Sequence, residues 1–214
     1  GHKFNPCRAH HYEMHKMEQN EVLEYFDFLQ SLADAAAKIT LSHFRQKVHV
    51  ENKNSQTNKI DPVTIADQKA EEVIRELILK KYPKHTIIGE EFDTIDGNPN
   101  YRWFIDPIDG TKSFISGVPL WGTLIGLEVN NVPELGIIDI PCMNERYLGS
   151  HTLKKAIRIK DGVSEDVITS NEKELKNVKF GYTTDEMFDD ERSRKVLDKA
   201  VSYTHLRAHE TFAN

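Results

Sequence analysis

The sequence predicts an α+β protein, because two helical patterns precede several short apolar segments of strand type. In the first pattern, apolar residues recur every three or four positions between Val22 and Ile39, which places them along one side of a helix. The second pattern begins at Thr64, whose hydroxyl can cap a helix while Asp67 bonds back to the Thr64 amide. Because proline cannot continue a helix, we expect this second helix to end before Pro83.

Apolar segments of strand type occupy residues 86–89, 101–105, 120–129 and 135–140. Asn130 and Asn131 follow the third segment and favour a hairpin turn leading to the fourth. The polar stretch 51–59 has no periodicity and predicts a loop between the two helices.

Composition limits the classes of function. The 214 residues suffice for one large domain or two small ones, and the formal net charge of −6 gives no positive field to attract nucleic acid. The longest mainly apolar segment, residues 120–127, is far shorter than the roughly 20 residues that cross a membrane. Cys7 and Cys142 are too few for a disulfide framework, which favours a cytoplasmic location. We therefore expect neither nucleic acid nor membrane as a partner.

The two ends of the chain differ from its middle. Residues 1–16 lack apolar periodicity and predict a disordered or non-native leader; the alternative is a metal cluster of Cys7, His10, His11 and His15. Residues 201–214 resemble a translated adapter and predict a non-native tail. Between the ends we expect an N-terminal metal-binding α+β domain at 17–150 and a partial C-terminal α/β domain at 151–200.

Acidic residues follow two of the predicted strands. Glu90 comes after the first strand and Asp106 after the second, with Asp109 close behind. Carboxylates at the ends of buried strands are held in position and face a shared edge. If they converge near Asp67, each pair at 4 Å repels by about 4 kcal/mol at an effective dielectric of 20, so a cation is needed. Oxygen ligands without thiolate or imidazole select Mg²⁺ or Mn²⁺.

The segment 106–111 (DPIDGT) adds a turn stiffened by Pro107. We expect this turn to present the carbonyl of Ile108 inward and to expose the amides of Gly110 and Thr111. Successive backbone amides bind anionic oxygens, and a metal ion lowers the pKa of a bound water. Metal ions beside such amides predict hydrolysis of a phosphate ester.

Each of these motifs also has a purely structural interpretation. The Asp109–Gly110 pair is a common turn signal, and Asp67 can serve only as a helix cap. Glu90 and Glu91 can be the solvated end of a strand. Their occurrence together, each beside an ordered element, favours a site over three unrelated structural roles.

Three motifs, DPVTIAD at 61–67, IIGEE at 87–91 and WFIDPIDGTKSF at 103–114, resemble the N-terminal signatures of the inositol monophosphatase superfamily of Mg²⁺-dependent phosphomonoesterases. The resemblance implies a layered αβαβα sugar-phosphatase fold, here with an incomplete second domain. Residues 110–127 and 183–188 are most similar to the histidinol-phosphatase branch. A histidinol-phosphate phosphatase of histidine biosynthesis is therefore expected, with an inositol monophosphatase or related small-molecule phosphatase as the alternative. The partners implied are a small phosphorylated metabolite and a second copy of the chain.

The same resemblance implies a role for each motif residue. Glu90, Asp106 and the carbonyl of Ile108 would hold one ion, and Asp106 with Asp109 a second, with two or three Mg²⁺ ions in all and Mn²⁺ as a substitute. Thr111, hydrogen-bonded to Asp67, would act with Glu90 on the attacking water, so that these three are the catalytic residues. The substrate-binding residues implied are Gly110, Thr111, Lys112 and Ser113.

The sequence departs from the family pattern in its C-terminal half. The resemblance implies a further Trp-Asp signature whose aspartate completes the second metal site, yet no Trp follows Trp121. We therefore expect the chain to end within its second domain, and a catalytically dead metal-binding fragment is a second alternative. A phosphatase acting on 3′-phosphoadenosine phosphate would need a basic or aromatic base pocket, which the sequence does not indicate.

Overall fold

The computed structural model describes residues 17–46, 50–52, 62–174, 177, 190–191, 193–196 and 198. The chain divides into two compact units, residues 1–167 and 168–214, and all the named helices and strands lie in the first. The expected leader at 1–16 and tail at 201–214 lie outside the described residues, as does the stretch 183–188.

Both predicted helices are present. The first, α1, spans Gln19–His43, and the second, α2, spans Ile65–Lys81, so it ends before Pro83 as expected. The predicted cap of α2 is confirmed as a capping box, because the Thr64 hydroxyl accepts from the Ala66 amide at 3.1 Å and Asp67 Oδ2 accepts from the Thr64 amide at 2.8 Å. Two shorter helices follow, α3 at Thr111–Ile115 and the 3₁₀ helix η1 at Pro141–Met143.

A seven-stranded sheet follows the helices, in the order β3-β4-β5-β6-β7-β8-β9. The strands are His85–Gly89, Asn98–Asp109, Gly122–Val129, Val132–Ile140, Glu145–Ser150, Lys155–Lys160 and Val163–Asp166. Strands β3 and β4 pair in parallel, whereas each later pair is antiparallel. Asn130 and Asn131 have φ values of 52° and 63°, which confirms the predicted hairpin between β5 and β6.

The structure contains strands that the sequence pattern did not predict. Strands β7, β8 and β9 extend the sheet to Asp166, so residue 150, the expected domain boundary, lies within the sheet between β7 and β8. Strands β1 (Val50–Asn52) and β2 (Pro62–Thr64) form a separate two-stranded sheet. The stretch 51–59, expected as a loop, therefore begins inside β1, and residues 53–59 lie outside the described residues.

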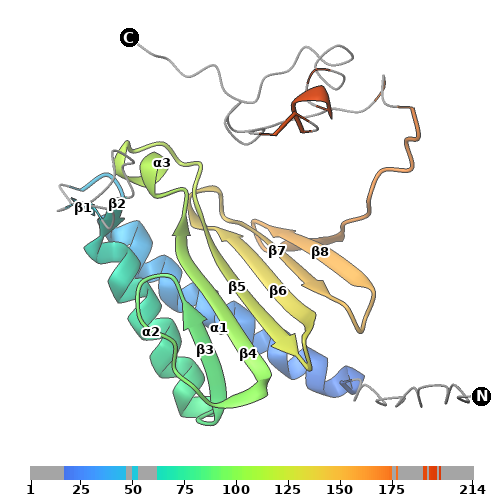
Figure 1. Ribbon diagram of the computed structural model, residues 1–214, viewed down its shortest axis with the longest axis horizontal. Helices are drawn as coiled ribbons and strands as arrows, with labels where there is room; N and C mark the ends of the chain where they lie inside the picture. Colours follow the sequence, from blue (N-terminus) through green and yellow to red (C-terminus); the bar gives the residue numbers. More distant parts are fainter. Residues whose placement is uncertain are drawn as a thin grey trace, which may run out of the picture. The chain divides into compact units, whose positions relative to one another are not determined.

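The main core lies between the sheet and the two long helices, which cover the same face of the sheet (Figure 1). Side chains alternate along β4, so Trp103 and Ile105 are buried against the helices while Phe104 is 40% exposed on the opposite face. Aromatic rings from three elements meet in this core: Tyr25, Phe28, Tyr82 and Trp103. No helix in the described segments is long and apolar enough to cross a membrane.

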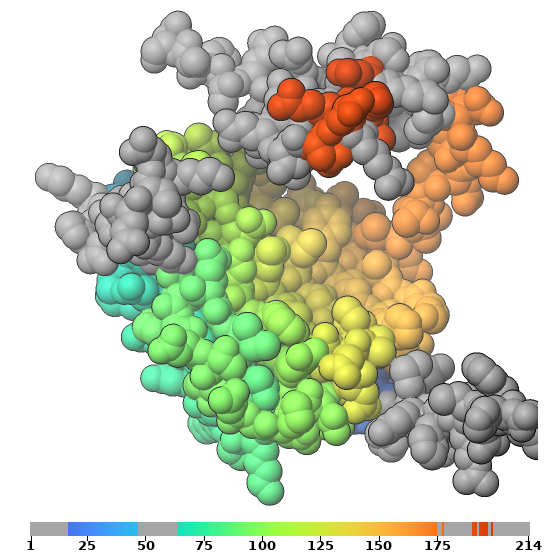
Figure 2. Space-filling model, viewed as in Figure 1, coloured from blue at the N-terminus to red at the C-terminus, as the bar shows by residue number. Residues whose placement is uncertain are grey.

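The opposite face of the sheet carries apolar side chains at the surface. Phe104 and Ile138 are 40% and 48% exposed there, and Leu124, which pairs with Ile138, lines the same face. Part of this face is visible in green and yellow in the space-filling view (Figure 2). The functional residues considered next lie at the end of this face.

Candidate metal and phosphate site

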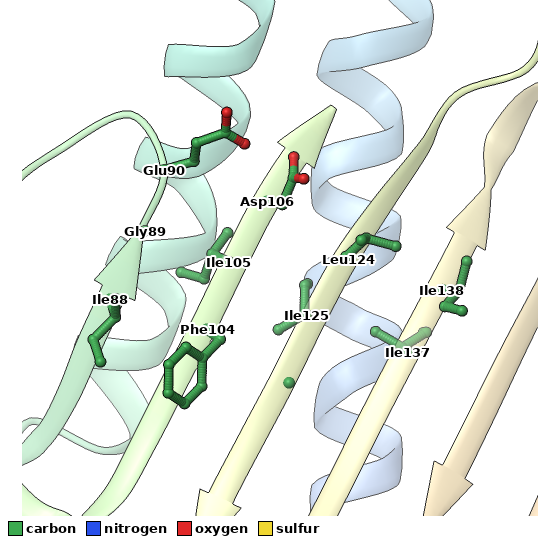
Figure 3. A pocket seen from close by; sticks show the side chains of 11 residues that line it. Ile88, Gly89, Glu90, Phe104, Ile105, Asp106, Leu124, Ile125, Ile137 and Ile138 are labelled. Carbon is green, nitrogen blue, oxygen red and sulfur yellow. The ribbon is translucent and has the colours of Figure 1, made fainter. Parts of the chain in front are cut away.

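Glu90 and Asp106 come together because β3 and β4 run in parallel. Gly89 is paired with Ile105, which places the next residue of each strand, Glu90 and Asp106, side by side. The amide of Glu90 also donates to the carbonyl of Ile105 at 3.2 Å. Figure 3 shows both carboxylates at the same end of the sheet face. The expected pairing of these two acids is therefore present, although Asp106 lies within β4 and not after it.

Asp106 is in an unfavourable electrostatic environment. Burial raises the pKa of Asp106 to about 8, and the neighbouring Glu90 adds to this effect through its charge and a hydrogen bond. Asp109 and Asp67 raise the pKa of Asp106 further through their negative charges. Three of the four acids that the sequence singled out thus act on the carboxyl group of the fourth, as expected for carboxylates that converge without a cation.

Asp106 also carries a buried oxygen without a hydrogen-bond partner, its Oδ1. A buried polar atom that lacks a partner is costly, and in functional sites an ion or water often supplies that partner. The three side chains that act on Asp106 are carboxylates, whose oxygen atoms are the ligands of hard divalent cations. The residues present therefore fit a bound Mg²⁺ or Mn²⁺.

The structure does not assemble a complete ligand shell. Among the residues it describes, no group of three Asp, Glu, His or Cys side chains is arranged to hold a metal ion. Asp109 ends β4 and is exposed, whereas Asp106 is partly buried. The assignment of Glu90, Asp106 and Asp109 as metal ligands thus remains a proposal.

A bulge in β4 shapes the turn after Asp106. Between the pairs Asp106–Leu124 and Asp109–Gly122, β4 has one residue more than β5, and such a bulge turns the strand and re-aims its side chains. The Thr123 hydroxyl donates to the carbonyl of Pro107 at 2.8 Å, which holds the bulge in place.

Gly110 allows the chain to turn from β4 into α3. Its φ of 93° lies in the left-handed region, and a Cβ atom here would approach the carbonyl oxygen of Leu120 to 3.0 Å. The hydroxyl of Thr111 donates to the carbonyl of Ile108 at 3.1 Å. The Thr111 proton is therefore used within the turn, whereas the family resemblance implied a hydrogen bond from Thr111 to Asp67.

The remaining site residues differ in exposure. Asp67 is 1% exposed, and its Oδ2 also accepts from the Thr64 hydroxyl at 2.5 Å, so its role as a helix cap coexists with its charge effect on Asp106. The side chain of Ile108 is buried with Ala66, Phe114 and Trp121. Lys112 is exposed and Ser113 is partly buried, at the start of α3.

A shallow cavity of about 500 Å³ extends from Glu90 and Asp106 along the open sheet face (Figure 3). Its remaining walls are apolar and come from β3 to β6, among them Ile88, Phe104 and Leu124. The two carboxylates thus lie at the polar end of an otherwise apolar surface.

Two buried charged residues on α2, Glu71 and Arg75, were not among the site residues predicted from the sequence. Both lie on the same side of the helix as Asp67, at successive intervals of four residues. Glu71 is fully buried and contacts the chain just after Glu90. The four-residue spacing from Asp67 was the signal that could have revealed this pair.

The chain is similar in sequence to known phosphatases. A family model described as "Inositol monophosphatase family" matches residues 21–210. The chain is 48% identical over 117 residues to a histidinol-phosphatase of Chlorobaculum parvum, covering 54% of this chain and 44% of that protein. It is 36% identical over 174 residues to the chloroplastic bifunctional phosphatase IMPL2 of Arabidopsis thaliana, covering 79% of this chain and 48% of that protein.

Solved structures agree at the level of the fold. An inositol monophosphatase from Zymomonas mobilis has a TM-score of 0.65 at 28% identity, covering 86% of this chain and 68% of that chain. A Thermotoga maritima IMPase also has a TM-score of 0.65, at 25% identity, covering 86% of this chain and 66% of that chain. The α+β layered fold expected from the sequence is thus confirmed. The chain spans about half the length of the curated relatives it matches. Because the family model matches most of its residues, this chain belongs to the inositol monophosphatase family.

Proposed function

We propose that this chain forms the metal- and phosphate-binding part of a Mg²⁺-dependent phosphomonoesterase. The observation that carries the proposal is the buried, unpartnered Oδ1 of Asp106 beside Glu90. A divalent cation would give that oxygen a partner and would offset the repulsion among the four acids. The family match supports the same chemistry.

In this proposal the ligands come from a short stretch of chain. Glu90, Asp106 and the Ile108 carbonyl would hold one ion, and Asp106 with Asp109 would hold a second. When bound, Mg²⁺ polarises the phosphoryl oxygens and lowers the pKa of a coordinated water. On a regular strand, residues three apart point to opposite faces. The extra residue in the β4 bulge between Asp106 and Asp109 changes this alternation, which allows both carboxylates to face the same side.

The chain's own groups then orient the reacting molecules. Because the Thr111 hydroxyl donates to Ile108, its oxygen can accept a hydrogen bond from the attacking water, while Glu90 accepts the proton. Asp67 maintains the negative charge of the site from the first turn of α2. The amides of Gly110 and Thr111 bind the phosphate oxygens, with Lys112 and Ser113 beside them.

We propose histidinol phosphate as the substrate. Relatives named histidinol-phosphatase from C. parvum and Streptomyces coelicolor, 48% and 39% identical, support this choice. The alternative is an inositol phosphate, which is supported by a relative from Aquifex aeolicus named fructose-1,6-bisphosphatase/inositol-1-monophosphatase, 35% identical over 146 residues. A role in histidine biosynthesis, a cytoplasmic location and a homodimeric state belong to the same proposal.

The test measures metal binding and turnover separately. Calorimetric titration with Mg²⁺ and Mn²⁺ should show binding by this chain, weakened more than about tenfold in Asp106→Asn. Asp96→Asn, which changes an exposed acid in the same unit, is the control and should bind like the parent. Phosphate release should be faster from histidinol phosphate than from inositol phosphate.

Each outcome has a distinct meaning. Metal binding without turnover of either ester would support the alternative of a catalytically dead metal-binding fragment. Equal or reversed rates would remove the substrate assignment. If neither the parent nor the control binds metal, the proposed site is wrong.

A further inference from the structure

Three charged residues form a buried stripe along α2. Asp67, Glu71 and Arg75 follow one another at intervals of four residues, which places them on one side of the helix. Their exposed fractions are 1%, 0% and 7%. Charged side chains are almost never buried in this way unless they are paired, so the partners of this stripe indicate its purpose.

Glu71 and Arg75 are bonded to each other and to the chain that follows Glu90. Arg75 Nε donates to Glu71 Oε1 at 2.7 Å, and Glu71 Oε2 accepts from the amide of Glu91 at 2.8 Å. The other guanidinium nitrogens of Arg75 donate to the carbonyls of Phe92 and Asp93, both at 2.9 Å. The backbone of three consecutive residues after Glu90 is therefore held by two side chains of α2.

The strand before Glu90 packs directly on the same ion pair. A Cβ atom on Gly89 would lie 1.9 Å from Glu71 Oε1 and 2.7 Å from Arg75 Nη2. Because the ion pair is buried and hydrogen-bonded to the backbone of Glu91, Phe92 and Asp93, it cannot give way easily to such an atom. The backbone on both sides of Glu90 is therefore held by this ion pair: Gly89 before it packs against the pair, and residues 91–93 after it are hydrogen-bonded to the pair.

We infer that Glu71 and Arg75 are positioning residues that hold the Glu90 carboxylate in the metal site. The inference rests on the proposed function, since it assigns Glu90 a metal. Both residues act through the backbone and do not touch the ion. Helix α2 carries Asp67 itself and holds Glu90 through Glu71, so it positions these two site acids relative to one another. A shift of Glu71 would move Glu90 without moving Asp67.

A purely structural ion pair would stabilise the fold and do nothing more. The two roles differ in what they predict for metal affinity, because ligand groups must be held within a fraction of an ångström to bind well. Substitution of residues that orient metal ligands typically lowers metal affinity 10- to 100-fold. A structural pair would change the unfolding temperature alone.

The experiment measures Mn²⁺ affinity of this chain by electron paramagnetic resonance, well below the unfolding temperature of every variant. Glu71→Gln keeps one acceptor oxygen but loses the charge, and Arg75→Lys keeps the charge but cannot reach both carbonyls. Each should weaken Mn²⁺ binding about tenfold or more. Glu72→Gln, an exposed neighbour on α2, is the matched control and should bind like the parent.

Hydrogen exchange provides a readout that does not depend on metal. In metal-free protein the amide of Glu91 should exchange faster in Glu71→Gln than in the parent or in Glu72→Gln. Unchanged Mn²⁺ affinity in both variants, with a lowered unfolding temperature, would overturn the positioning role. If the parent binds no Mn²⁺, the proposed function fails, while unchanged exchange at Glu91 would separately show that Glu71 does not hold this loop.

Discussion

Trp103 donates its indole N–H to Nδ1 of His85 at 3.1 Å, and this bond requires His85 to be neutral at that nitrogen. The His85 ring is stacked between Tyr82 and Tyr101, with ring centroids 4.7 and 4.6 Å away. Burial lowers the pKa of His85 below its ordinary value of 6.5. The aromatic core is thus built around an uncharged imidazole.

This arrangement predicts a pH dependence of stability. Because the folded-state pKa of His85 is lowered, the unfolded chain binds the proton more readily. The stabilisation is complete above about pH 6.5 and is lost as the pH falls below that value towards the folded-state pKa. Urea unfolding at about pH 7.5 and about pH 5.5 should show a larger loss of unfolding free energy in the parent than in His85→Gln. An equal loss in both proteins would contradict this account.

Removal of the Asp106 carboxyl group should stabilise the metal-free chain. The raised pKa of Asp106 lowers the stability of the fold at neutral pH, because the unfolded chain releases this proton more readily. Asp106→Asn removes the ionisable group and supplies an amide that can donate to the Glu90 carboxylate. Without metal we expect a gain of about 1 kcal/mol in the free energy of unfolding, as is typical when a functional site is relieved of strain. Urea unfolding in the presence of a chelator measures the gain, and a loss of stability would argue against repulsion at this site.

Gly110 should not tolerate a side chain. Gly110→Ala forces a residue with a Cβ into a φ of 93° and against the carbonyl of Leu120, which we expect to cost about 1 to 2 kcal/mol. Gly149→Ala is the control, because a Cβ atom there meets nothing within 4 Å. Thermal unfolding should show a clear decrease for the first variant and little change for the second; similar decreases would show that the turn geometry is not the cause.

Arg146 should be a major contributor to stability through Asp139. Its Nε donates to Asp139 Oδ1 at 2.9 Å, and the Asp139 side chain is only 3% exposed. Burial raises the pKa of Asp139, against the opposing effect of Arg146. Arg146→Met leaves that carboxyl group buried without its cation, and we expect a loss of about 3 kcal/mol.

Two controls separate this buried pair from the surface pair that Arg146 forms with Asp34. Asp34→Asn removes an exposed partner and should cost less than about 1 kcal/mol. The double variant Arg146→Met with Asp139→Leu should recover most of the loss. If Asp34→Asn costs as much as Arg146→Met, the buried pair is not the source of the stability.

The parts of the fold that were predicted correctly have signals in the local sequence. The apolar periodicity of α1, the Thr64–Asp67 capping box and the Asn130–Asn131 turn each depend on residues close in sequence, and all three are present. Strand β8 was missed because it is rich in charged residues, and β9 because it has a single apolar residue and is exposed along its length; both are stabilised by pairing, β8 with β7 and β9 with β8.

In the candidate site, too, some features follow from the local sequence and others only from the tertiary structure. The sequence by itself determined which acids stand beside which strands and helix, because Glu90, Asp106 and Asp67 lie next to recognisable local patterns. Only the tertiary structure decided that β3 and β4 run in parallel, and that Glu71 and Arg75 turn inward to hold the chain after Glu90. Strand direction and buried side-chain bonds join residues far apart in the chain, and their energies depend on burial, which no local pattern specifies.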